Sequence, residues 1–326
     1  MKPPLVGTNR RARRLLLVTL VAPGTHLVDV HYLGRPEIIA VGVIDTGVGT
    51  LLIDPGPSCA LPALRQGITN LGVAVGDISA ILLTHIHLDH AGAVGSLLRD
   101  NPAIRVYVHE KGAHHLIDPS RLLDSARRLY REDMDRRWGE FLPVPAPNVI
   151  ALTGSETLRF ADRRFPVADT PGHASHHVSF LDHATGTAFV GDAGGNRYSN
   201  RNYVSPVTPP PDGDLAGWQT SIDQFRRWDP ARLFSTHFGC SNPVGAHLDE
   251  LESRLALWSD RVRTSLADTG RSDEQHATEF VGWVAAQIRE RLAPADAVMY
   301  EWGTTAINSW HGLARYWRTT TGDAPR

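Results

Sequence analysis

The chain has 326 residues, of which 42% are hydrophobic and 21% charged, and its formal net charge is −2 at pH 7. These values are typical of a globular protein with one large domain or two smaller ones. The near-neutral charge gives no electrostatic basis for binding nucleic acid or an anionic membrane, and no run approaches the roughly 18 apolar residues of a membrane span. Two cysteines cannot form a disulfide scaffold, which favours a reduced, cytoplasmic protein.

The N-terminus contains a basic stretch followed by an apolar run, "RRARRLLLVTLVAPG" (10–24). This is the outline of an export signal, but the apolar run is short and no A-x-A cleavage pattern follows it. We interpret residues 1–25 as an N-terminal extension, with a first β-strand as the alternative.

From residue 26 onward, strand-like and helical patterns alternate. The predicted elements are strands over 26–56, a helix over 60–72, a strand over 78–84, a helix over 92–99, a strand over 104–110, a charged helical segment over 112–140, short strands over 149–193, a helix over 215–228 and a strand over 232–239. Prolines mark the segments 143–148 and 194–214 as irregular. The remainder, 246–318, predicts three helices.

One short stretch carries an unusual density of polar residues at the end of a predicted strand. "THIHLDHAG" (84–92) places His85, His87, Asp89 and His90 directly after the apolar run "ISAILLT". Imidazoles and carboxylates are buried at a cost unless they are paired, and they are the ligands that zinc, iron and manganese prefer. Four such residues in six positions on a turn can serve two adjacent metal ions.

Three further residues of these types follow predicted strands at single positions. They are His173 in "TPGH", Asp192 in "GDAG" and His237 in "STHFG". Each lies close to a glycine, which permits a tight turn of the backbone. Ligands for one shared site are expected at such strand ends.

Taken in order, "THIHLDHAG", "TPGH", "GDAG" and "STHFG" resemble the motifs of the metallo-β-lactamase-fold hydrolases over about residues 26–245. The resemblance implies an α/β fold, a four-layer αββα sandwich, here with a helical C-terminal extension. It divides the chain into the N-terminal extension (1–25), a catalytic domain (26–245) and a C-terminal helical region (246–326).

The resemblance also implies the roles of the site residues. His85, His87 and His173 would hold one metal, and Asp89, His90 and His237 the second, with Asp192 bridging them. Asp54 in "LLIDPG" matches the carboxylate that orients the ligands. The expected cofactors are two divalent ions, zinc first, with iron, manganese or cobalt as alternatives.

This ligand set predicts a hydrolase in which a metal-bridging hydroxide attacks the carbonyl or phosphoryl centre of a small ester-type substrate. Lactones, esters, thioesters and phosphotriesters are the candidates, and the sequence "GDAGG" departs from the "GDTLF" of glyoxalase II. Asp89 is a candidate proton shuttle. The alternative is a non-hydrolytic iron oxygenase or oxidoreductase of the same fold, although such dioxygenases lack ligands of the second metal.

Substrate contacts are predicted at three positions: Tyr198 and Tyr203 in the proline-containing loop, and His176 close to His173. The long insert around 112–140 resembles the organophosphate-hydrolase-like members, in which it helps to wall the pocket. Trp302, Trp310 and Trp317 are interpreted as core or homodimer contacts, with capping of an apolar pocket as the alternative. The expected partner is therefore a small-molecule substrate.

Overall fold

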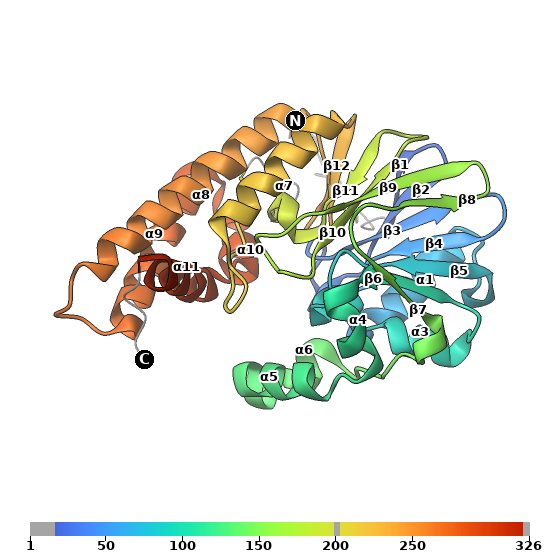
Figure 1. The fold of residues 1–326 in the computed structure, drawn as a ribbon, viewed down its shortest axis with the longest axis horizontal. Coiled ribbons are helices and arrows are strands. Elements are labelled where there is room, and N and C mark those ends of the chain that lie inside the picture. Colours follow the sequence, from blue (N-terminus) through green and yellow to red (C-terminus); the bar gives the residue numbers. More distant parts are fainter. Residues whose placement is uncertain (1–16, 199–202, 322–326) are drawn as a thin grey trace, which may run out of the picture.

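Two β-sheets packed face to face form the centre of the computed structural model, which describes residues 17–198 and 203–321 (Figure 1). Within those residues the first sheet has seven strands in sequence order, antiparallel from β1 to β4 and parallel from β4 to β7. Its strands are β1 (Val18–Ala22), β2 (Thr25–Asp29), β3 (Ala40–Asp45), β4 (Thr50–Ile53), β5 (Ile78–Leu82), β6 (Arg105–His109) and β7 (Val149–Leu152).

The second sheet has six strands in the described part of the chain, in the order β13-β12-β11-β10-β9-β8. They are β8 (Thr157–Phe160), β9 (Arg163–Asp169), β10 (Val178–Asp182), β11 (Thr187–Phe189), β12 (Arg232–Ser235) and β13 (Gly239–Ser241). Only β11 and β12 pair in parallel, and the other pairs are antiparallel. Both sheets are thus mixed, as the resemblance predicts.

Alternation of side chains along the strands divides the core into layers. In β4, Leu51 and Ile53 face the second sheet, whereas Leu52 packs against the helices on the other side. In β12, Phe234 faces the first sheet and Leu233 faces outward. Successive residues of a strand point to opposite faces, so strands that are apolar throughout are covered on both sides.

Helices cover the outer faces of both sheets (Figure 1). Apolar residues of α1 (Leu61–Asn70), α3 (Val94–Asp100) and α4 (Glu110–Ile117) pack against the first sheet. Those of α7 (Leu215–Trp228) and α8 (Val244–Leu266) pack against the second. The predicted four-layer αββα sandwich is confirmed.

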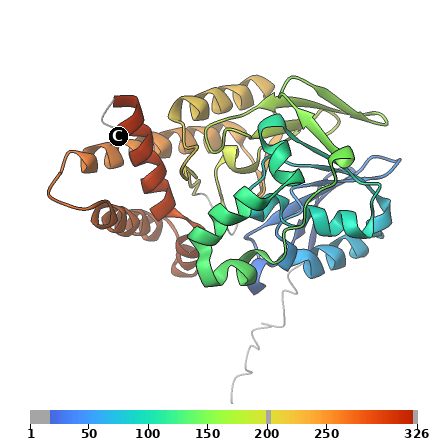
Figure 2. The ribbon, with the colours of Figure 1, turned by 60° about the horizontal axis from the view of Figure 1, so that its bottom comes forward.

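The predicted charged segment 112–140 contains several helices. After α4, the chain forms α5 (Ser120–Tyr130) and α6 (Met134–Trp138). Pro119 precedes α5, and Gly139 follows α6 with a φ of 70°, a left-handed conformation that ends the helix at little cost. These helices lie beside the sandwich, on the side from which the C-terminal helices also extend (Figure 2).

The C-terminal region departs from the prediction of three helices, because the described residues form four. They are α8, α9 (Asp273–Arg291), α10 (Pro294–Gly303) and α11 (Ala306–Thr321). Helix α10 was not predicted because its ten residues begin at a proline and end at a glycine, and both residue types indicate the end of a helix when the sequence is taken alone. Trp310 of α11 is fully buried, which agrees with its interpretation as a core residue.

At the N-terminal side, the sheet begins before the predicted boundary at residue 26. Strand β1 pairs with β2, with Val18 opposite Val28, so residues 18–22 follow the alternative interpretation of a first strand. Across the ranges that the structure describes, no helix is both long and apolar enough to cross a lipid bilayer.

Phe189 is fully buried between the two sheets, and its replacement tests how much this layer contributes to stability. Phe189→Ala should lower the free energy of unfolding by about 3–5 kcal/mol, because it removes buried apolar area and leaves a cavity. Urea denaturation followed by circular dichroism measures this loss. Leu257→Ala, at a side chain that is 47% exposed, is the matched control and should change little. Equal midpoints for the two variants would contradict the assigned core.

Candidate metal centre

The predicted ligands meet because the strands that precede them end at one edge of the sandwich. Strands β9, β11 and β12 run in the same direction, since β9 and β11 are each antiparallel to β10 and β11 is parallel to β12. His173, Asp192 and His237 follow the ends of these three strands. The first motif follows β5 of the other sheet, and its residues Leu88–Ala91 form the short helix α2.

The first group consists of three imidazoles that converge on one point. His85 Nε2 and His173 Nε2 each lie 3.0 Å from His87 Nδ1. All three rings are buried or nearly so. Their arrangement presents three nitrogen atoms to one position, as a transition-metal ion requires.

The second group consists of Asp89, His90 and His237. His237 Nε2 lies 3.3 Å from Asp89 Oδ2, and His90 Nε2 lies 4.0 Å from Asp89 Oδ1. The ligand atoms of this group lie within 4.8 Å of one another, which is also true of the first group.

The carboxylate of Asp192 spans the two groups. Its Oδ2 is 3.6 Å from His173 Nε2, whereas its Oδ1 is 3.4 Å from His90 Nε2 and 3.7 Å from His237 Nε2. One oxygen therefore faces each group. This is the geometry that a bridging carboxylate needs.

Two buried polar atoms at this point have no hydrogen-bond partner among the described residues: His90 Nε2 and Asp192 Oδ1. Such atoms are rare in protein interiors because each lost hydrogen bond costs about 1–3 kcal/mol. A cation coordinated by both would satisfy them, so the residues present fit divalent metal.

The outward nitrogens of the imidazoles are held by the surrounding protein. His173 Nδ1 donates to the carbonyl of Val207 and His237 Nδ1 to that of Ile38, each at 2.8 Å. Because a carbonyl can only accept, each Nδ1 carries a proton, which leaves Nε2 as the atom of each ring that faces the centre. Such contacts fix the orientation of metal-binding histidines.

Asp54 lies directly behind the ligands, fully buried, with a φ of 46°. Its Oδ1 accepts a hydrogen bond from the backbone N–H of Thr84 at 2.8 Å. Its Oδ2 is contacted by the hydroxyls of Thr84 (2.7 Å) and Thr236 (2.8 Å) and by His90 Nδ1 (2.8 Å). The carboxylate contacts one predicted ligand directly and the residues that precede two others.

The pKa values of the imidazoles differ between the two groups of ligands. Burial, reinforced by the neighbouring His173, lowers the pKa of His87 to about 4. Burial also lowers the pKa values of His85 and His173. These imidazoles are neutral at pH 7 and have free lone pairs.

In the second group the carboxylates reverse this direction. Burial acts to lower the pKa values of His90 and His237, but Asp192 and other nearby carboxylates outweigh it, and both pKa values are raised. Burial acts to raise the pKa of Asp89, yet the charge of His90 and the hydrogen bond from His237 lower it to about 2. The imidazoles of the second group therefore keep their protons to higher pH than those of the first group, and a metal ion competes with those protons.

The candidate centre opens into a cavity of about 760 Å³. His87, Asp89, His173 and Asp192 lie at its base. Its walls come from α4, α5 and α6, from the loop around Pro209–Asp212 and from Thr305 and Asn308 at the start of α11. Three segments far apart in the sequence therefore border the space beside the predicted metals.

The three predicted substrate contacts differ in position. His176 lines the cavity, and its ring centre lies 5.5 Å from that of His87. Tyr198 does not line it, and its hydroxyl donates to the carbonyl of Gly303 at 2.8 Å. Tyr203 is fully buried beneath the guanidinium of Arg254, 3.6 Å from the ring centre, so the structure does not bring it to the site.

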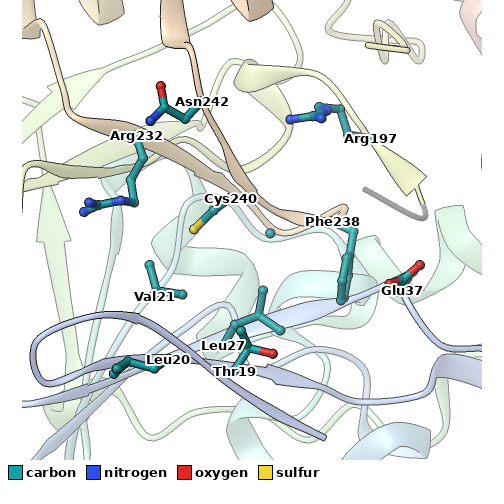
Figure 3. Close-up of a pocket in the computed structure, with 11 residues that line it drawn as sticks. Thr19, Leu20, Val21, Leu27, Glu37, Arg197, Arg232, Phe238, Cys240 and Asn242 are labelled. Carbon is teal, nitrogen blue, oxygen red and sulfur yellow. The ribbon is translucent and has the colours of Figure 1, made fainter. Parts of the chain in front are cut away.

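A second cavity, of about 540 Å³, lies between the edge strands of the two sheets (Figure 3). Val21 and Leu27 contribute to one side, and Arg232, Phe238 and Cys240 to the other. None of the predicted metal ligands lines it. We therefore take the cavity over the histidine cluster as the candidate active site.

Sequence reasoning missed the two threonines that anchor Asp54. Thr84 directly precedes His85 and Thr236 directly precedes His237. The repeated Thr-His pair at two strand ends was the available signal. It also missed Thr305 and Asn308, for which the sequence carries no local signal because the two residues reach the cavity only through the packing of the C-terminal helices.

Replacing Asp54 tests its role behind the ligands. Asp54→Asn should weaken zinc affinity about 10- to 100-fold, because an amide cannot accept all of the hydrogen bonds from Thr84, Thr236 and His90. Competition with a chromophoric chelator measures the affinity. Asp169→Asn, at a half-exposed carboxylate beside His109, is the control and should bind zinc normally. Unchanged affinity in Asp54→Asn would contradict the orienting role.

The divided pKa values predict that the two metal equivalents differ in pH dependence. His90 and His237 have raised pKa values, so below those values a metal must displace protons, and affinity should fall as the pH falls. His85, His87 and His173 have lowered pKa values and should bind metal near pH 7 with little proton release. Zinc calorimetry in buffers of different ionisation enthalpy measures the protons released. Equal release for both equivalents would contradict this division.

The chain is similar in sequence to proteins of one large superfamily. The sequence model described as the metallo-beta-lactamase superfamily matches residues 34–237. The chain is 25% identical over 292 residues to "Probable metallo-hydrolase YqjP" of Bacillus subtilis, a match that covers 82% of this chain and 86% of that protein. It is 28% identical over 236 residues to the "Metallo-beta-lactamase fold-containing protein ST1585" of Sulfurisphaera tokodaii, covering 71% and 85%.

Two further comparisons bear on the fold and on chemistry. The structure of the metallo-beta-lactamase family protein TTHA1429 from Thermus thermophilus superimposes with a TM-score of 0.68 at 22% identity and covers 93% of this chain and 95% of that one. This likeness concerns the fold and extends over the C-terminal helices. "Hydroxyacylglutathione hydrolase GloC" of Haemophilus influenzae is 29% identical over 141 residues, which cover 43% of this chain and 59% of that protein.

Proposed function

The chain belongs to the metallo-beta-lactamase superfamily, and on that premise we propose that it is a dinuclear metal-dependent hydrolase of small ester-type substrates. The observation that carries the proposal is the position of Asp192, with one carboxylate oxygen facing each of the two ligand groups. His85, His87 and His173 would hold one ion and Asp89, His90 and His237 the other. Zinc is the first candidate for both.

When bound, two such ions supply a hydroxide nucleophile at neutral pH and polarise the attacked oxygen. The protein residues orient the metal ligands and enclose the space in which the substrate would bind. Asp54 and the carbonyls of Val207 and Ile38 hold the imidazoles in place. Asp89 lies partly exposed at the base of the cavity and is our candidate for carrying a proton to the leaving group.

Acyl substrates are the first candidates within this class. The relative GloC is named for a hydrolase of a glutathione thioester, and the cavity offers apolar side chains such as Leu122 and Leu129 to an acyl chain. We therefore rank thioesters, esters and lactones above phosphotriesters. The completeness of the second ligand group favours this hydrolase over the alternative of an iron oxygenase.

The direct test is turnover by the zinc-loaded protein. We would measure kcat/KM for an aryl thioester, a lactone and an aryl phosphotriester of similar size, together with the zinc content per chain. Two zinc ions and a preference for an acyl substrate support the proposal. Hydrolysis of none of the three, with two zinc ions bound, would contradict it.

His173→Ala should reduce kcat/KM at least about a hundredfold and lower the zinc content, because it removes one of three nitrogens of the first group. Zinc analysis and steady-state kinetics check both parts. His183→Ala, at an exposed histidine outside the site, is the control and should behave as the unmodified protein. Turnover near that of the unmodified protein in His173→Ala would show that the site is assigned wrongly.

A further inference from the structure

Helix α5 turns a broad face toward the cavity above the metal centre. Residues spaced three, four and seven apart lie on one side of a helix, and the lining residues of α5 follow that spacing. They are Arg121, Leu122, Ser125, Ala126, Arg128, Leu129 and Tyr130. Most of the helix therefore borders the space in which a substrate would lie.

The arginines of this face that line the cavity are Arg121 and Arg128. Arg121 and Arg128 are exposed, and neither guanidinium forms an ion pair with a carboxylate of the described residues. Arg127 of the same helix points elsewhere, and its Nη1 lies 3.6 Å from Asp124. Asp118 lies within electrostatic range of Arg121, but neither arginine is in ion-pair contact with a carboxylate of the described residues.

The rest of the lining does not offset them. Lys111 also borders the cavity, and its Nζ donates to the carbonyl of Ser175 at 3.2 Å. Among the described lining residues, the one carboxylate outside the metal centre is that of Asp212, which accepts from the backbone and the hydroxyl of Ser175. The cavity therefore carries an excess of positive charge above its base.

Apolar side chains share this wall of the cavity with the arginines. Leu122, Ala126 and Leu129 form a stripe beside Arg121 and Arg128, and Leu129 is 56% exposed. Trp138 closes this wall, and its indole N–H is buried without an acceptor among the described residues. An exposed apolar stripe flanked by unpaired cations matches an amphipathic anion.

From these contacts we propose that α5 selects substrates in which an apolar segment joins the scissile acyl bond to an oxyanion, either carboxylate or phosphate. This proposal rests on the hydrolase function above. Arg121 and Arg128 are the specificity-determining residues, and they act on binding of the distant anion. The reacting atoms remain at the histidine cluster.

The experiment compares thioesters that share one hexanoyl-thioester core. One probe is neutral at both ends, one carries a carboxylate at the end of the acyl chain, one carries a carboxylate on the thiol, and one carries a phosphate monoester on the thiol. KM and kcat are measured for the zinc-loaded protein and for Arg121→Gln/Arg128→Gln. Arg127→Gln is the matched control, because its side chain lies on α5 but outside the cavity.

We expect at least one anionic probe to have a KM about tenfold below that of the neutral probe. The double variant should lose this preference with kcat unchanged, and Arg127→Gln should keep it. The preference should weaken with added salt. The anionic product of each probe, a thiol or a carboxylic acid, can also be titrated by calorimetry. Its affinity should fall in the double variant and stay unchanged in Arg127→Gln.

Three outcomes overturn the proposal, and all three differ from failure of the proposed function. Equal kcat/KM values for neutral and anionic probes would leave a hydrolase without anion selection. A preference that survives in the double variant would exclude α5 as its source, and loss of binding to phosphatidylglycerol vesicles by that variant would assign the face to a membrane surface. Hydrolysis of no probe would instead contradict the hydrolase itself.

Discussion

The buried carboxylate of Asp54 ties the two sheets together at the point where the metal centre lies. Asp54 follows β4 of the first sheet, and its Oδ2 is shared by His90 and by the hydroxyls of Thr84 and Thr236. Thr236 follows β12 of the second sheet. Because Thr84 and Thr236 precede His85 and His237, one carboxylate sets the relative positions of ligands that come from different sheets.

The buried ionisable groups of the site are tolerated because the acidic side chains lie next to basic ones and the remaining imidazoles are neutral. His90 lies between Asp54, Asp89 and Asp192, and these acids keep its pKa high in spite of burial. The first group contains imidazoles alone, and burial keeps them neutral. An uncompensated buried charge would destabilise the fold by several kcal/mol. The two metal positions thus differ electrostatically, although one carboxylate connects them.

The sandwich positions the reacting groups, whereas the elements added to it shape the space above them. Helices α5 and α6 form one wall of the cavity, and the start of α11 supplies Thr305 and Asn308 on another. The apolar and cationic side chains of α5 belong to the cavity wall and not to the centre. Differences in substrate choice between proteins of this fold can therefore arise in such walls without any change in the ligands.

The sequence by itself determined the fold class, because "THIHLDHAG", "TPGH", "GDAG" and "STHFG" resemble the motifs of a known family, and it determined the candidate ligands, because these motifs place metal-binding residue types directly after apolar strands. Local spacing carries that information. Only the tertiary structure decided that Tyr203 packs away from the site, that His176 reaches it, and that α5 and α11 border one cavity. Those relations depend on how segments distant in sequence pack, and no local pattern encodes them.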